Sequence, residues 1–182
     1  MTTFTITIQD QAVQSALKAL ADRATNLGPV MGLISARMQE DTQRRFETGT
    51  GPDGQLWKKN TAATLEMLSK RLAKSYRKKN GEPNSRGVEQ LSNKKPLNPL
   101  HGTPQLKNAF NAYVSERGFT LVNSKEYAAI HQFGGTTGAN SWTHGAKITA
   151  RPFLPIKPDG TLYPQEQATV LDELNNWLIN GR

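Results

Sequence analysis

Apolar and polar residues alternate at the start of the chain, and the pattern then changes to a helical period. Between residues 3 and 8 three apolar residues alternate with threonines: Phe4, Ile6 and Ile8. This period of two predicts a strand with one buried face. Asp10 is the expected N-cap of the following helix, in which a narrow apolar stripe recurs at helical spacing: Val13, Ala16, Leu17, Leu20 and Ala24.

The segment Asn26–Pro29 interrupts this helix and leaves two alternatives open. The chain forms either a pair of helices or one long helix that is broken near Gly28. Proline favours the first turn of a helix, and apolar residues recur on one side after Pro29: Val30, Leu33, Ile34, Met38 and Phe46. Three glycines and one proline within residues 48–54 end this pattern, because such a run supports neither helix nor strand.

Residues 58–104 are predicted to form a basic arm made of a helix and a loop. Residues 61–79 have the apolar spacing of a helix, with cations around the other sides of it. Its apolar side contains Leu65, Leu68, Leu72 and Tyr76. Residues 80–104 are rich in Gly, Pro, Asn, Ser and Lys, which predicts a long loop that becomes ordered on contact with a partner.

Strand signals lie in the second half of the chain. Residues 106–113 predict a short helix or an entry from helix to strand, and residues 119–123 predict a strand. A second long polar loop is expected over residues 134–145. A short strand at 147–150 and a stiff corner at 151–155 follow, because two prolines restrict φ there. The last helix is predicted over residues 165–179, with these side chains inward: Val170, Leu171, Leu174, Trp177 and Leu178.

These elements predict one α+β domain over residues 1–182. Long N-terminal helices and a C-terminal helix pack on a small, mostly antiparallel β-sheet, and two long polar loops extend from it. The length of 182 residues agrees with a single domain. Only 36% of the residues are hydrophobic and the mean hydropathy is -0.61, so part of the chain is expected outside the core.

The formal charge of +8 is concentrated in the predicted arm. Residues 58–95 contain eleven basic and three acidic residues, whereas the rest of the chain contains twelve of each. The sequence therefore predicts a basic arm, facing a partner, on an electrically balanced body.

Candidate catalytic and metal-binding residues are sparse. The chain has no cysteine, which excludes disulfides, thiolate metal sites and a thiol nucleophile. The histidines His101, His131 and His144 have no metal-site spacing and no Gly-x-Ser-x-Gly elbow beside them. The acidic pairs Glu40–Asp41 and Asp172–Glu173 point about 100° apart on a helix and form no acid/base pair. We expect no enzyme activity, cofactor, metal, secretion signal or membrane contact.

The cations of the arm allow two interpretations. They form either a solvated helix face with i to i+4 pairs, or a surface that binds DNA phosphates or an acidic protein partner. The contact residues in the second interpretation are Lys70, Arg71, Lys74, Arg77, Lys78 and Lys79. Only Trp57 and Tyr76 accompany them, which is too few aromatic residues for a base-stacking platform.

Four segments occur in a fixed order along the chain: GPDGQLW at 51–57, LHGTPQL at 100–106, YAAIHQFGG at 127–135 and ITARPFL at 148–154. Together they resemble the virion morphogenesis or tail completion family of Mu-like and P2-like tailed bacteriophages. The chain departs from that family at Thr103–Pro104, where the family more often has Thr-Gly.

The resemblance implies a non-enzymatic structural component of the virion that joins the head connector to the tail terminator or tube. It implies a homo-oligomeric ring at the head–tail junction, assembled in the host cytoplasm, with six copies by analogy to other tail completion and terminator proteins. The basic arm then contacts packaged DNA or an acidic neighbouring ring. The alternative is an accessory protein that binds DNA without sequence specificity through its basic helix.

Six residues in or beside the matched segments are the expected subunit or partner interface: Trp57, Tyr127, His131, Gln132, Arg151 and Phe153. Trp57 is expected to be an apolar anchor. His131 and Gln132 are expected where an extended element reverses at Gly134. Arg151 is expected to present its guanidinium group to a carboxylate on a neighbour. Maintenance of the fold is the other interpretation of these residues.

Overall fold

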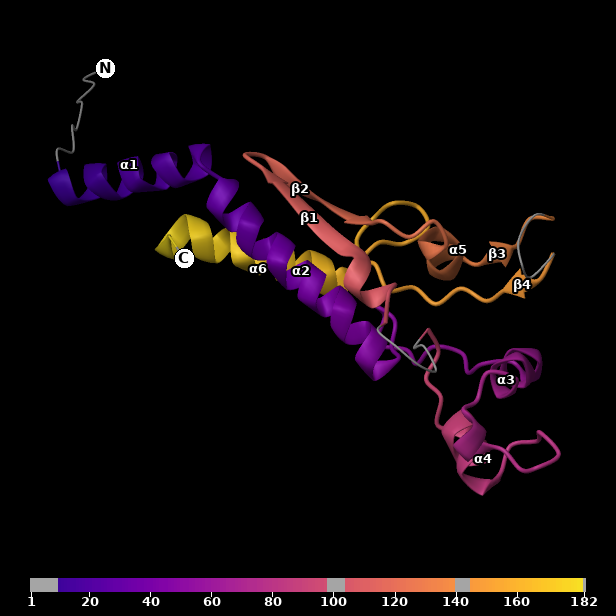
Figure 1. Cartoon of the computed structure of the whole chain (residues 1–182). Helices are drawn as coiled ribbons and strands as arrows, with labels where there is room; N and C mark the ends of the chain where they lie inside the picture. The colour runs from indigo at the N-terminus through magenta and orange to yellow at the C-terminus, as the bar shows by residue number, and fades with distance from the viewer. Residues whose placement is uncertain (1–9, 98–103, 140–144, 182) are drawn as a thin grey trace, which may run out of the picture.

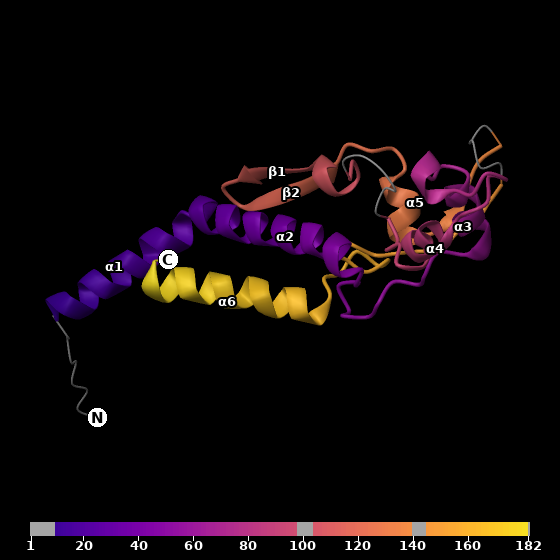
Figure 2. The same ribbon diagram turned by 60° about the horizontal axis from the view of Figure 1, so that its bottom comes forward.

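The molecule is an elongated α+β protein, as the sequence predicts. In Figure 1, helices α1 (Gln11–Thr25) and α2 (Gly28–Thr48) follow one another, and helix α6 (Pro164–Asn180) runs beside α2. Figure 2 shows α2 between α6 and a β-hairpin. The computed structural model describes residues 10–97, 104–139 and 145–181, so the strand predicted at residues 3–8 lies outside the described residues.

Local capping residues define the N-terminal helices. The Asp10 side chain accepts hydrogen bonds from the N–H groups of Ala12 (2.8 Å) and Val13 (3.2 Å), which confirms the predicted N-cap of α1. The chain leaves the helical conformation at Asn26, where φ is -115° and ψ is 79°, so the pair of helices is confirmed. Gly49 ends α2 in the left-handed region, with a φ of 74° that favours glycine.

The β-structure consists of two small antiparallel hairpins. Strands β1 (Phe110–Ser115) and β2 (Gly118–Asn123) pair from Phe110 opposite Asn123 to Ser115 opposite Gly118, and this hairpin packs on α2. A turn of 3-10 helix, η2 (Lys107–Ala109), precedes β1, which confirms the predicted entry from helix to strand. The second hairpin pairs β3 (Gly135–Thr136) with β4 (Lys147–Ile148).

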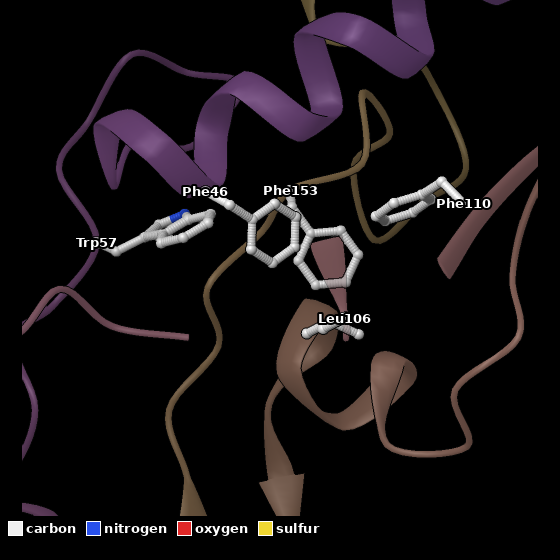
Figure 3. Packing of buried hydrophobic residues seen from close by; sticks show 5 residues of the cluster. All are labelled: Phe46, Trp57, Leu106, Phe110 and Phe153. Carbon is white, nitrogen blue, oxygen red and sulfur yellow. The ribbon is translucent and has the colours of Figure 1, made fainter. Parts of the chain in front are cut away.

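Two clusters of buried side chains hold these elements together. One combines α2 with the loops and β1, and its five side chains are shown in Figure 3: Phe46, Trp57, Leu106, Phe110 and Phe153. The other lies between α2 and α6, where Val30, Ile34 and Met38 are buried against Val170, Leu174 and Trp177. Helix α6 confirms the predicted last helix, but Leu171 is 51% exposed, so its predicted inward position is wrong.

The predicted long basic helix is wrong beyond Ser69. Helix α3 (Ala62–Ser69) ends there, and the cations that follow lie in a turn and in the short 3-10 helix η1 (Lys74–Tyr76). The cause is a set of short-range hydrogen bonds to one side chain. The guanidinium group of Arg77 donates to the carbonyl groups of Ser69 (2.8 Å), Leu72 (3.0 Å) and Gly81 (3.3 Å), which stabilises a folded-back chain in place of a straight helix.

The predicted loop over residues 80–104 contains a helix, so that prediction is also wrong in part. Helix α4 (Ser85–Ser92) begins at Asn84, whose side chain accepts from the N–H group of Gly87 (3.0 Å) and donates to the Ser75 carbonyl (2.9 Å). A β-carbon at Gly87 would lie 2.3 Å from the carbonyl oxygen of Tyr76. Glycine at this position therefore lets α4 pack directly on η1.

Candidate interaction surfaces

Trp57 and Phe153 form part of the aromatic cluster in Figure 3. The rings of Phe46 and Trp57 meet edge to face with centroids 5.5 Å apart, and the Trp57 indole donates to the Pro152 carbonyl (2.9 Å). Phe153 is only 1% exposed. In this chain both residues anchor the core, as expected for Trp57, and their role at a subunit interface stays a prediction.

Helix α5 (Ala128–Phe133) replaces the extended element that the sequence predicts before Gly134. Gly134 ends the helix with a φ of 74°, and a β-carbon there would lie 3.0 Å from the backbone nitrogen of Ala150. A positive φ and a close approach of the backbone, both of which favour glycine, therefore coincide where the chain turns after the helix.

Gln132 joins α5 to the corner at residues 151–155. Its buried Oε1 atom accepts from the N–H groups of Phe153 (2.8 Å) and Leu154 (2.9 Å). The N–H group of Arg151 donates to the His131 carbonyl (2.8 Å). Two of the four segments that carry the family resemblance are thus bonded to each other.

Arg151 bonds to the beginning of the arm within its own chain. It is 8% exposed, and it donates through Nε to the Lys58 carbonyl (3.2 Å) and through Nη2 to the Lys59 carbonyl (3.4 Å). Neither partner is a carboxylate. Burial lowers the pKa of Arg151. The guanidinium group therefore remains a partly buried positive charge, and its predicted contact with a neighbour's carboxylate stays a prediction.

His131 and Tyr127 lie beside this charge. The rings meet edge to face with centroids 6.0 Å apart, and Tyr127 is 43% exposed. The Nδ1 atom of His131 is buried without a hydrogen-bond partner among the described residues. Burial, and to a smaller extent the charge of Arg151, lowers the pKa of His131, so the neutral imidazole is favoured.

The structure divides the six predicted contact cations of the arm by their environments. Arg77 is bound to backbone carbonyl groups and supports the fold of the arm. Lys70 and Lys78 form exposed ion pairs with Glu66 (3.3 Å) and Glu82 (3.5 Å), of the kind that water and salt screen strongly. Arg71 is exposed, and so are two lysines without an ion-pair partner in the described part of the chain: Lys74 and Lys79.

A groove of about 620 Å³ lies beside the second hairpin and was not predicted from the sequence. It is lined by Lys58, by residues 133–135 at the end of α5 and by residues 147–150 of β4 and its continuation. None of its lining residues is acidic. The groove combines residues far apart in the sequence, and the glycine pair Gly134–Gly135 was its only local signal.

A buried ion pair was also missed by the sequence analysis. Arg45 of α2 donates to a carboxylate oxygen of Glu166 in α6 and to the Phe153 carbonyl (2.7 Å). Burial lowers the pKa of Arg45 and raises the pKa of Glu166. The pair connects both long helices to the aromatic cluster.

The described part of the chain contains no group of three His, Asp or Glu side chains that would hold a metal ion. Among its helices, none is both long enough and apolar enough to cross a bilayer. The described structure thus has a core of packed aromatic side chains with a buried ion pair beside it. Its surface carries a folded basic arm and a groove without acidic lining residues.

The sequence as a whole is similar to that of known phage proteins. It matches the phage virion morphogenesis family over residues 8–178, and the chain belongs to that family. It is 26% identical over 167 residues to Mu-like prophage FluMu G protein 2 of Haemophilus influenzae, across 92% of this chain and 89% of that protein. No solved structure matches the chain. The resemblance found in the four segments is confirmed, and the chain has a structural role in building a phage particle.

Proposed function

We propose that this protein is a neck or tail completion component that joins head and tail, and that it acts as a homo-oligomeric ring. Six copies is the number expected by analogy. One face contacts the head connector and the other contacts the tail terminator or tube. The observation that carries the proposal is membership of the virion morphogenesis family across residues 8–178.

The apolar face of α1 supports self-association. Val13, Leu17 and Leu20 are 49%, 61% and 42% exposed. Helix α1 contacts α6 through another side, where Arg23 donates to the Leu178 carbonyl (2.9 Å) and the Ile179 carbonyl (2.7 Å). At about 100° per residue, the side chains of the apolar stripe point roughly 60° to 120° away from that of Arg23. A short helix gains most of its stability from packing of its apolar face, so this stripe is suited to another subunit.

Leu17→Glu tests the ring. The substitution places a charge in the centre of the exposed stripe without touching the bonds of Arg23, so the subunit should fold and the oligomer should dissociate. Sedimentation velocity of the purified protein measures this change. Ser15→Glu is the control, because it adds the same charge on the opposite side of α1. A wild-type monomer at all concentrations, or equal dissociation in both variants, would count against an α1-mediated ring.

A second candidate is binding of duplex DNA without sequence specificity. It is favoured by the positive charge of the arm and by the exposure of Lys74 and Lys79. Reversal of both charges should then weaken duplex binding and reduce its dependence on salt. Unchanged binding at low salt would eliminate these two lysines as DNA contacts.

A further inference from the structure

We propose that the groove beside β3 and β4 binds an extended acidic segment of a neighbouring protein, with alternating acidic and apolar side chains. The inference rests on the proposed function in the phage neck, and it names the surface and the chemistry of one partner. In both views the second hairpin lies at the end of the molecule far from α1. A segment bound there would leave the stripe on α1 available for contacts between subunits.

The charge of the groove favours a carboxylate-bearing occupant. Lys58 and Lys147 line it, both are exposed, and neither has an ion-pair partner in the described structure. Arg151 follows the lining residue Ala150 and bonds to the carbonyl group of Lys58. Its charge is only 8% exposed and lacks a carboxylate partner within the described chain, so it adds positive potential at the wall of the groove.

The backbone of the groove favours an extended chain. Strand β4 pairs with β3 on one side only, within the residues that the structure describes. A peptide laid along an open strand edge forms main-chain hydrogen bonds, and its side chains point alternately to opposite faces. The groove is short, so a few residues of extended chain at about 3.3 Å each would cross it.

The apolar surface of the groove distinguishes a peptide from DNA. Phe133 is 52% exposed at the end of α5, and Ile148 lies beside it in the lining. Aliphatic side chains on one face of a peptide would cover these residues while acidic side chains on the other face meet the lysines. The convex phosphate surface of a duplex would reach the lysines and leave Phe133 in water.

Fluorescence anisotropy can test this with a labelled peptide of about eight residues in which Glu and Val alternate. The test variant is Lys58→Glu with Lys147→Glu, and we expect about tenfold weaker binding. The control is Lys18→Glu with Lys157→Glu, which makes the same change in net charge at two lysines that do not line the groove. Lys58→Gln with Lys147→Gln should give an intermediate loss, and this milder pair preserves the test if the charge reversal disturbs folding.

Several results would overturn the inference. These are no binding of the peptide, an equal loss in the control pair, or an equal loss when Lys74 and Lys79 are reversed. A peptide alternating Gln and Val that binds as tightly would also overturn it, because charge would then play no part. A duplex that displaces the peptide and depends equally on Lys58 and Lys147 would assign the groove to phosphate. All these assays use the purified full chain, so their failure leaves the neck assignment intact.

Discussion

Gln132 is the residue through which α5 holds the corner that carries Phe153. Its Oε1 atom is the acceptor for two backbone N–H groups. Gln132→Leu has a similar volume but leaves both donors buried without a partner, so we expect the free energy of unfolding to fall by about 3 kcal/mol. Chemical denaturation measures this loss. Gln167→Leu is the control, because Gln167 is exposed on α6, and a small effect at both positions would contradict the role of Gln132.

The role of a single residue could be predicted where it depends on that residue's neighbours in the sequence. Asp10 as a cap and Trp57 as an apolar anchor follow from their immediate neighbours in the sequence, and the structure confirms both. The partners of Arg151 could not be predicted, because the carbonyl groups of Lys58 and Lys59 lie about ninety residues earlier in the chain. An arginine beside a proline indicates a guanidinium group carried by a stiff backbone. It does not indicate which acceptors the fold brings to that group.

At the scale of elements, the folded-back arm depends on Arg77. Arg77→Ala removes three bonds to backbone carbonyl groups, so the arm should open locally while the body remains folded. Hydrogen exchange of the amides in α3 and α4 should become about ten- to a hundredfold faster, which corresponds to a loss of roughly 1–3 kcal/mol.

Two further variants separate the hydrogen-bonding geometry of the Arg77 guanidinium group from its charge. Arg77→Lys keeps the charge but cannot reach three acceptors in one plane, so it should behave nearly like Arg77→Ala. Lys79→Ala removes an exposed charge and should leave exchange unchanged. Exchange in Arg77→Lys that equals the wild type would show that charge alone orders the arm.

The sequence predicted the long helices and the strand at residues 119–123 because their periods and caps are local signals. It failed in the arm for a related reason. Leu65, Leu68, Leu72 and Tyr76 have helical spacing, yet Leu72 is buried after the helix has ended, against the folded-back segment. Periodicity reports which side chains are buried, and a turn stabilised by the side chain of Arg77 leaves the same pattern as a continuous helix.

At the scale of the whole molecule, the formal charge of +8 is not a uniform property of the surface. The arm is folded, one of its arginines is bound to backbone carbonyl groups, and two of its lysines are paired with nearby carboxylates. The groove beside β4 adds positive potential at the same end of the molecule. The apolar stripe of α1 lies at the other end. Separate surfaces for subunits and for partners are what the proposed ring between head and tail would require.

The central claim is that this protein joins heads to tails, and electron microscopy of particles made without it tests that claim most directly. A phage with the gene interrupted should produce DNA-filled heads and separate tails, and a copy of the gene supplied in trans should restore complete virions. Intact, infectious virions assembled without the protein would contradict the account.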